Sequence, residues 1–150
     1  MTEIKADQAL RRSPLYRRHQ ALNAQFEKIG DALVVRKYGD TTMEPRLGLS
    51  LAMADLSTLP RTGFKGAGAP EWAASQSVEL PTKPNMAVVQ ADGALVTMLS
   101  QQELLITSDM GGESTLVDRL NQQTLPAQTY ALPRADSHSW LAVTGLLAAE

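Results

Sequence analysis

The sequence predicts an α+β fold, and three observations lead to that prediction. Leu15, His19, Leu22, Phe26 and Ile29 recur at steps of three and four residues, which is typical of one face of a helix. Further along the chain, three apolar runs are separated by turn residues, which indicates paired strands. The expected helices and strands follow one another in a mixed order, and this order favours α+β over a strictly alternating α/β arrangement.

The composition excludes several classes of protein. The chain has 150 residues, with 14 basic and 16 acidic side chains, so its net charge of -2 argues against binding nucleic acid through a globally basic surface. It has no cysteine, which excludes disulfides, thiolate zinc sites, iron–sulfur clusters and a cysteine nucleophile. No apolar run is long enough to cross a membrane, and the polar N-terminus does not resemble a signal peptide. We therefore expect a soluble, cytoplasmic protein.

The first elements follow from local signals. Residues 1–12 are charged and lack periodicity, so we expect a flexible polar tail there and a single domain over residues 13–150. Ser13 and Pro14 predict a helix start, because a serine oxygen caps free amides and proline suits the first helical position. Gly30 predicts the end of that helix.

The middle of the chain predicts shorter elements. Strands are expected at residues 32–36 and 61–66, with a loop over residues 40–46 between them. Residues 47–56 are apolar and fit either a helix or a strand, and the pattern does not decide between the two. A short helix is expected at residues 70–75.

The strongest strand signal lies in three runs, at residues 86–90, 94–99 and 103–107, which predict an antiparallel meander with Asp92-Gly93 as one turn. Beyond Gly111 the sequence predicts a short amphipathic helix at residues 116–120. Two further strands are expected at residues 129–132 and 139–144, and a last helix is expected to start within residues 146–150.

Few residues suggest chemistry. The glycines Gly63, Gly66 and Gly68 have the reverse order of a dinucleotide fingerprint and lack the lysine of a phosphate loop, so we interpret them as a strand exit that needs close backbone packing. His138 lies in a polar turn before a strand. Asp55 is close enough to Ser57 for a local hydrogen bond.

No catalytic residue is identified from these patterns, and two histidines without cysteine argue against a structural metal site. His19 falls on the apolar stripe of the first helix. Four arginines, Arg11, Arg12, Arg17 and Arg18, surround the start of that helix, where cations oppose the helix dipole. They form either a solvated face or a contact with something acidic.

Short stretches of the chain resemble a known family. Ser13-Pro-Leu-Tyr16, with His19, Ala21-Leu22, Val34-Val35 and Tyr38-Gly39, resembles the opening of the aminomethyltransferase (glycine-cleavage T-protein) fold. Asp55-Leu-Ser57 and the step from Phe64 through Gly66 to Ala69 are similar to the next signature of that fold.

The later stretches resemble a relative of the same fold, the gamma subunit of heterotetrameric sarcosine oxidase. They are Leu80-Pro-x-x-Pro-Asn85, Gly93-Ala-Leu-Val96, Gln102-Glu-Leu-Leu-Ile106 and the run from His138 to Gly145. Together the similar stretches span residues 13–150.

The resemblance implies ferredoxin-like strand–helix units of the T-protein folate-binding type, in a mostly antiparallel sheet. It implies a non-catalytic, gamma-type subunit of a flavoenzyme that oxidatively demethylates sarcosine or a related N-methyl amine. FAD, FMN, NAD and tetrahydrofolate would then belong to the larger flavoprotein subunits, and none is expected on this chain. The alternative is a stand-alone tetrahydrofolate-binding, aminomethyltransferase-like protein.

Three departures from the T-protein pattern bear on this choice. Thr58 stands where that pattern has a histidine, and Asp92-Gly93-Ala94-Leu95 lacks the paired aspartates. No catalytic or folate-binding residue is therefore carried over, which favours the gamma-subunit interpretation. The family also continues with further strands beyond the position of Glu150. We therefore expect a fold that is incomplete at the C-terminus and that self-associates, or pairs with a partner, through residues 139–150.

The first helix is the expected place of partner contact, through Leu15, Tyr16 and His19 with Arg17 and Arg18 beside them. The alternative is that the apolar stripe covers the domain's own sheet, since an amphipathic helix must bury its apolar face somewhere.

Overall fold

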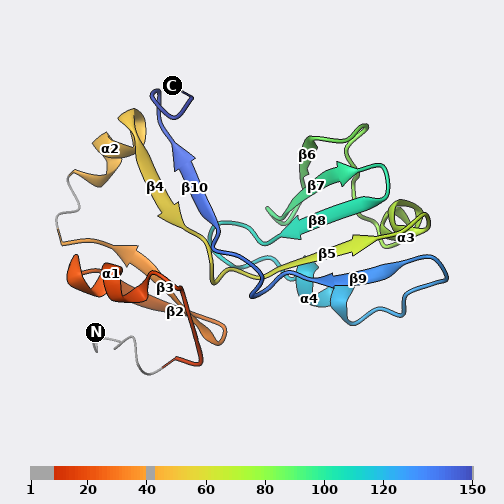
Figure 1. Cartoon of the computed structure of the whole chain (residues 1–150), viewed down its shortest axis with the longest axis horizontal. Helices are drawn as coiled ribbons and strands as arrows, with labels where there is room; N and C mark the ends of the chain where they lie inside the picture. Colours follow the sequence, from red (N-terminus) through yellow and green to blue (C-terminus); the bar gives the residue numbers. More distant parts are fainter. Residues whose placement is uncertain (1–8, 40–42, 150) are drawn as a thin grey trace. The chain divides into compact units, whose positions relative to one another are not determined.

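The computed structural model describes residues 9–39 and 43–149, and the chain divides into two compact units (Figure 1). Unit 1 comprises residues 1–58 and 138–150, and unit 2 comprises residues 59–137. The sequence led us to expect one domain over residues 13–150. That expectation stays a prediction. Among the residues that the structure describes, the two units have separate sheets, and no sheet combines strands of both.

Unit 1 contains a three-stranded sheet with the order β1-β3-β2. Strand β1 (Arg11–Arg12) runs parallel to β3 (Ala32–Lys37), and β2 (Gln25–Ile29) pairs with β3 antiparallel. The expected tail over residues 1–12 is corrected at its end: Arg11–Arg12 is a strand, held where the backbone N–H of Arg11 donates to the carbonyl of Asp31 at 3.2 Å. Residues 1–8 lie outside the described part of the chain.

The first helix is much shorter than predicted. Helix α1 spans only Tyr16–Ala21, and Asn23 adopts a φ of 57°, a left-handed conformation that asparagine tolerates and that ends the helix. Residues 25–29 then form β2, and Gly30, with a φ of 58°, occupies the hairpin turn into β3 instead of ending a helix. The predicted strand at residues 32–36 is confirmed as β3.

The ambiguous stretch at residues 47–56 contains both kinds of element. Helix α2 spans Glu44–Ser50, and strand β4 spans Ala52–Asp55. Strand β4 pairs antiparallel with β10 (Leu141–Thr144) in a separate two-stranded sheet. The predicted loop at residues 40–46 is thus helical from Glu44, and residues 40–42 lie outside the described part.

The last helix expected from residue 146 does not form within the described residues, which are in turns up to residue 149. Gly145 has a φ of 111°, and a Cβ there would lie 2.2 Å from the carbonyl oxygen of Ser50. The amides of Leu146 and Leu147 donate to the carbonyls of Leu49 and Ser50, each at 3.0 Å. These amides satisfy carbonyls at the C-terminal end of α2 and hold the turn there.

Unit 2 is built on a five-stranded antiparallel sheet with the order β6-β7-β8-β5-β9. The predicted meander is confirmed as β6, β7 and β8, and the strand predicted at residues 61–66 is confirmed as β5. The bounds are Arg61–Lys65 for β5, Met86–Val89 for β6, Leu95–Ser100 for β7, Glu103–Thr107 for β8 and Tyr130–Pro133 for β9.

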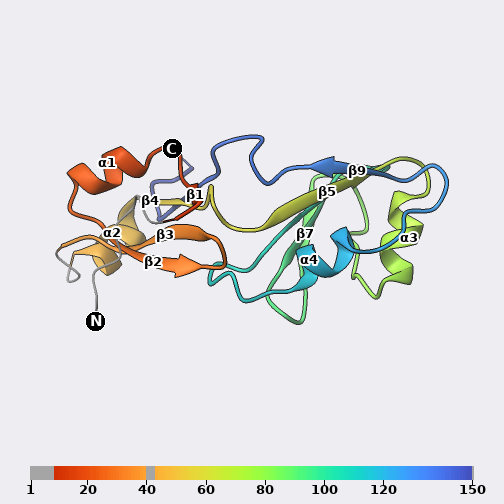
Figure 2. The same cartoon turned by 90° about the horizontal axis from the view of Figure 1, so that it is seen from below.

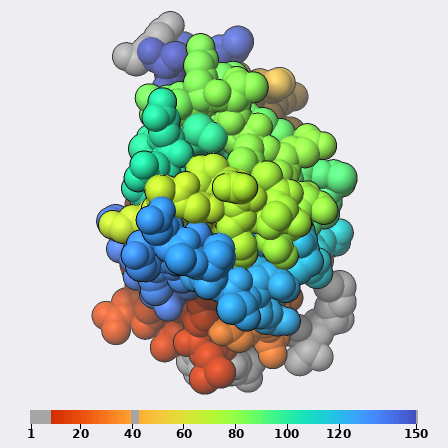
Figure 3. All heavy atoms as spheres, turned by 90° about the vertical axis from the view of Figure 1, so that its right-hand side faces the viewer, coloured from red at the N-terminus to blue at the C-terminus, as the bar shows by residue number. Residues whose placement is uncertain are grey.

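Helices α3 (Ala69–Ser75) and α4 (Leu116–Asn121), both predicted, lie on one face of this sheet (Figure 2). Between them and the strands lies an aliphatic core with one aromatic pair, in which the rings of Phe64 and Trp72 are 4.6 Å apart. The yellow-green residues around α3 and the blue residues from α4 to β9 cover one end of unit 2 (Figure 3). The overall class is therefore α+β with mostly antiparallel sheets, as predicted.

Candidate functional site

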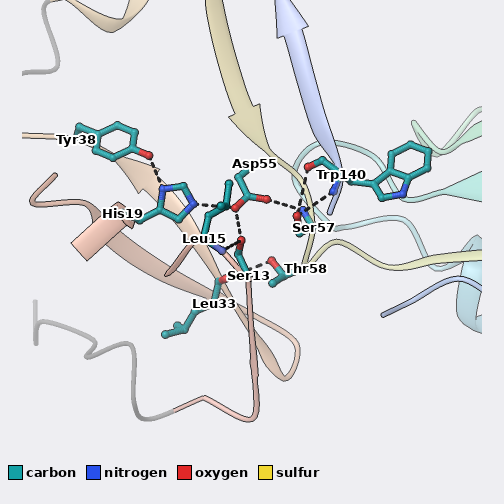
Figure 4. Close-up of polar contacts among 9 residues, drawn as sticks. All are labelled: Ser13, Leu15, His19, Leu33, Tyr38, Asp55, Ser57, Thr58 and Trp140. Carbon is teal, nitrogen blue, oxygen red and sulfur yellow. Dashed lines mark hydrogen bonds and ion pairs between the residues drawn. The ribbon is translucent and has the colours of Figure 1, made fainter. Parts of the chain in front are cut away.

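The most polar buried cluster in unit 1 lies where α1 faces the end of β4, and it is centred on His19 (Figure 4). The side chain of His19 is only 9% exposed. Its Nε2 lies 2.8 Å from Oδ2 of Asp55, and its Nδ1 lies 2.7 Å from the hydroxyl of Tyr38. A carboxylate only accepts hydrogen bonds, so Nε2 carries the hydrogen, and in a neutral imidazole Nδ1 then accepts from Tyr38.

Asp55 is the acceptor for several donors. Its Oδ2 accepts from the hydroxyl of Ser13 as well as from His19, and its Oδ1 accepts from the backbone N–H of Ser57 at 3.0 Å. Burial raises the pKa of Asp55, but the hydrogen bonds from His19, Ser13 and Ser57 outweigh burial and hold that pKa below its usual value. The carboxylate is therefore ionised at neutral pH.

The order of these groups differs from that of a nucleophilic triad. In such a triad the imidazole lies between the hydroxyl and the carboxylate, so that it takes the proton from the hydroxyl. Here the carboxylate of Asp55 lies between Ser13 and His19, and both nitrogens of His19 are already occupied. Ser13 is therefore not activated by the imidazole, and the cluster is suited to holding three segments of unit 1 together.

The cavity beside the cluster is small. Its volume is about 10 Å³, which is room for one water molecule. Ser13, His19 and Asp55 form its polar side, and Phe26 and Leu33 belong to its apolar side. A substrate or cofactor does not fit this space as it stands.

Ser13 has a different role from the predicted one. It does not cap α1, which begins at Tyr16, and Pro14 is not the first helical residue. Its hydroxyl instead accepts from the backbone N–H of Leu15 at 3.0 Å, just before the helix. This contact fixes the entry into α1 while the same hydroxyl donates to Asp55.

Ser57 and Thr58 make structural contacts in the same unit. The backbone N–H of Trp140 donates to the Ser57 hydroxyl at 2.9 Å, across 83 positions of sequence. The Thr58 hydroxyl donates to the carbonyl of Leu33 at 3.2 Å. At Thr58, the position where the T-protein pattern has a histidine, the side chain therefore bonds to the chain's own backbone.

The predicted partner-contact residues are divided between interior and surface. His19 is buried, and its side chain is hydrogen-bonded to Asp55 and Tyr38. Its predicted contact with a partner stays a prediction. Leu15 and Tyr16 are half-buried, while Arg17 and Arg18 are exposed. The structure thus presents the two arginines, with part of Tyr16, to solvent.

The arginines are arranged around one aromatic ring. The guanidinium carbon of Arg12 lies 4.8 Å from the centroid of the Tyr16 ring, and that of Arg17 lies 5.7 Å from it. Arg17 Nε also donates to the Tyr16 hydroxyl at 3.1 Å, and this hydrogen bond, with the charge of Arg17, lowers the pKa of Tyr16. Arg11 has a carboxylate partner, Asp31, at 3.4 Å.

The glycine cluster of unit 2 serves backbone packing. Gly66 has a φ of 119°, and a Cβ there would lie 2.0 Å from the carbonyl oxygen of Gln128. A Cβ on Gly68 would lie 2.8 Å from the hydroxyl of Thr129. Both glycines allow the exit of β5 to approach the segment before β9 closely, which agrees with the interpretation as a strand exit.

The remaining candidates lie elsewhere. His138 is exposed, in the segment before β10.

Among residues 9–39 and 43–149 the structure brings together no group of three histidine, cysteine, aspartate or glutamate side chains able to hold a metal ion. Over the same residues, no helix has the length and apolar character needed to cross a bilayer.

Sequence reasoning identified Asp55 with Ser57 and placed His19 on the helix, but it missed their association. The Asp55–Ser57 contact is local, whereas His19 and Asp55 are 36 positions apart. Tyr38 entered only through the family resemblance, and no periodicity or spacing singles it out. The position of His19 on an otherwise apolar stripe was the signal in the sequence that pointed to such an association, because a buried histidine needs a hydrogen-bond partner.

Comparison with known proteins links the chain to others by structure. No family model matches the sequence, and no curated protein matches it either. The structure is similar to a solved structure of the glycine cleavage system aminomethyltransferase T from Bartonella henselae, with a TM-score of 0.67 and 15% sequence identity. The likeness covers 94% of this chain and 42% of that one. The chain therefore shares the fold of part of a glycine-cleavage aminomethyltransferase T-protein.

Proposed function

We propose that this chain is a non-catalytic, gamma-type subunit of a sarcosine oxidase-like flavoenzyme. One observation carries the proposal: Ser13 and His19 are both hydrogen-bonded to Asp55, beside a cavity with room for a single water. An architectural role uses such a cluster without requiring substrate to reach it. The T-protein fold supports the proposal, since the sequence resembles the gamma subunit as a relative of that fold.

The proposed partners are the larger flavoprotein subunits of an enzyme that demethylates sarcosine or a related N-methyl amine. FAD, FMN, NAD and tetrahydrofolate are assigned to those subunits. The exposed Arg17 and Arg18 are the proposed contact with an acidic surface of a partner, because their side chains face solvent beside Tyr16.

The first experiment is affinity purification of the tagged chain from its native source. We expect larger, flavin-containing chains to co-purify with it. Their absence from the purified material, with the tagged chain folded, would contradict the proposal.

Charge reversal tests the contact itself. We expect the double variant Arg17→Glu, Arg18→Glu to reduce the yield of co-purified flavoprotein. The melting temperature of the isolated chain should fall only slightly, because both side chains are exposed and the lost contact of Arg17 with Tyr16 lies at the surface. A control is Lys83→Glu, at an exposed cation of unit 2. Assembly that survives the double variant would remove the arginines from the interface.

The alternative is a stand-alone tetrahydrofolate-binding, aminomethyltransferase-like protein, and the likeness to the aminomethyltransferase T structure favours it. Isothermal titration calorimetry with tetrahydrofolate separates the two. A dissociation constant near about 1 μM, equivalent to about −8 kcal/mol, would support the alternative. The absence of heat, together with no thermal shift, would support the gamma-type subunit.

A further inference from the structure

Two arginines of unit 1 lie around the ring of Tyr16. The guanidinium carbon of Arg12, at the end of β1, is 4.8 Å from the ring centroid, and that of Arg17, in α1, is 5.7 Å from it. Arg17 Nε also donates to the Tyr16 hydroxyl at 3.1 Å, which leaves the two Nη groups of Arg17 to donate to another acceptor. These three residues are here called the arginine clamp.

The buried cluster around Asp55 fixes the turn that joins the two parts of the arginine clamp. On one side of the turn, Arg12 pairs with Leu33 in the β1–β3 ladder. Within the turn, Ser13 is buried, and its hydroxyl donates to Asp55 and accepts from the backbone N–H of Leu15, just before α1. Because the turn is anchored, the two arginines lose less conformational freedom on binding a ligand than side chains on a mobile loop would.

The positive charge of the arginine clamp is not balanced by a carboxylate nearby. Residues 8–26 contain four arginines and no aspartate or glutamate. In the part of the chain that the structure describes, no acidic side chain lies within ion-pair distance of Arg12 or Arg17, whereas Nε of Arg36 lies 4.0 Å from a carboxylate oxygen of Glu27. Two like charges beside one ring repel each other, and an anion bound to both would remove that repulsion.

The chemistry of the arginine clamp favours a carboxylate. A planar guanidinium presents parallel N–H groups that match the two oxygens of one anionic group. A nucleic acid is held by cations spaced along several phosphates, whereas Arg12 and Arg17 share a single ring and therefore fit one anionic group. A protein surface supplies such a group directly, as the side chain of an aspartate or a glutamate.

We propose that the arginine clamp binds a carboxylate in an acidic segment of the partner protein, and that Tyr16 is the positioning residue that holds the two guanidiniums for it. The carboxylate accepts from Arg12 and from the Nη groups of Arg17, while the Tyr16 hydroxyl keeps Nε of Arg17 in place. The inference rests on the proposed function for the existence of a partner. It extends the contact surface from Arg17 and Arg18 to Arg12 and Tyr16.

A fluorescently labelled hexaglutamate peptide tests the arginine clamp on the isolated full chain. Fluorescence anisotropy at low ionic strength should show binding that Arg12→Gln weakens by about threefold. The matched control is Arg36→Gln, which removes the same charge from an exposed arginine of unit 1 that already has a carboxylate partner, and it should weaken binding less. Arg17→Lys should also weaken binding, because it keeps the charge but loses the planar guanidinium.

Tyr16→Phe separates positioning from folding. It keeps the ring and removes the hydroxyl that accepts from Arg17, so we expect hexaglutamate binding to weaken by about twofold. Urea unfolding followed by circular dichroism should give nearly the same free energy of unfolding as for the unmodified chain, because the lost hydrogen bond is exposed. Tyr16→Leu, which removes the ring as well, should weaken binding as much as Arg12→Gln does.

The absence of hexaglutamate binding, or equal weakening by Arg12→Gln and Arg36→Gln, would overturn the proposal. Tighter binding of labelled hexathymidylate than of hexaglutamate would also overturn it, because the ligand would then be a chain of phosphates. The subunit role and the arginine clamp fail separately. Hexaglutamate binding by a chain that co-purifies with no flavoprotein contradicts only the subunit role, whereas flavoprotein that co-purifies undiminished with Arg12→Gln contradicts only the arginine clamp.

Discussion

Asp55 receives hydrogen bonds from the side chains of Ser13 and His19, which are distant in the sequence, and from the nearby backbone N–H of Ser57. These donors explain why a carboxylate is tolerated at a side-chain exposure of 6%. An ionised group removed from water is costly unless donors replace the lost hydration. Ser13, His19 and the amide of Ser57 supply those donors. The same contacts lower the pKa of Asp55, so the cluster stabilises the folded state most when the carboxylate is ionised.

Asp55→Asn should therefore destabilise unit 1 by about 2 kcal/mol at neutral pH, because an amide oxygen accepts more weakly than a carboxylate and its NH₂ group faces two donors. Because the folded-state pKa lies below the unfolded value of about 3.9, this stabilisation is present above that value and is lost as the pH falls through the folded-state pKa. The difference in the free energy of unfolding between Asp55→Asn and the unmodified chain should therefore shrink as the pH falls.

Urea unfolding followed by circular dichroism at a series of pH values measures this difference. Asp118→Asn, at an exposed carboxylate in α4, is the control and should have little effect. A stability difference between Asp55→Asn and the unmodified chain that persists unchanged into acid would show that the charge of Asp55 is not what stabilises the cluster.

At the scale of elements, turn residues determine where helices and strands end more strongly than hydrophobic periodicity does. The stripe from Leu15 to Ile29 is compatible with one helix, but Asn23 in a left-handed conformation ends α1, and residues 25–29 form backbone hydrogen bonds with β3 instead. A spacing of three and four residues records only which side chains are apolar. The pairing of β2 with β3 across the turn at Gly30 was not part of that pattern, which is why the helix was overpredicted.

Gly66, just after β5, and Gly48, inside helix α2, should respond in opposite ways to an added methyl group. Gly66→Ala should destabilise unit 2 by about 2 kcal/mol or more, because the new Cβ meets the carbonyl of Gln128 and the φ is left-handed. Gly48→Ala in α2 should stabilise unit 1 by up to about 1 kcal/mol, because alanine favours helix and nothing lies within 4 Å of the added atom.

Thermal unfolding followed by calorimetry checks whether Gly66→Ala lowers the stability and Gly48→Ala raises it. A tolerated Gly66→Ala would show that the approach of the Gln128 carbonyl is not required, and would reopen the question of why the glycine cluster exists.

On the scale of the whole molecule, apolar burial is unequally divided. Of the buried apolar residues that the structure describes, all except Ala32 and Leu33 belong to unit 2. Unit 1 is instead held by strand pairing and by the cluster around Asp55, and it exposes the apolar side chains of Met53, Leu141 and Val143. Since apolar burial is the main favourable term in folding, unit 2 should be the more stable of the two.

Amide hydrogen exchange measured by mass spectrometry tests this inequality. Peptides covering β5, β7 and β8 should exchange more slowly than those covering β2, β3 and β4, because local opening follows the density of buried apolar contacts. Equal protection throughout the chain would indicate that the two units unfold as one cooperative body.

The sequence by itself determined the α+β class, the meander of β6, β7 and β8, and the positions of α3 and α4, because these depend on turn residues and apolar spacing within about ten positions. It also excluded any chemistry that needs cysteine. Only the tertiary structure decided where α1 ends, that the chain forms two units, and that His19 bonds to Asp55. Those features depend on groups such as His19 and Asp55, or Ser57 and Trp140, that are 36 and 83 positions apart. No local pattern encodes such contacts, because they form only when the chain has folded.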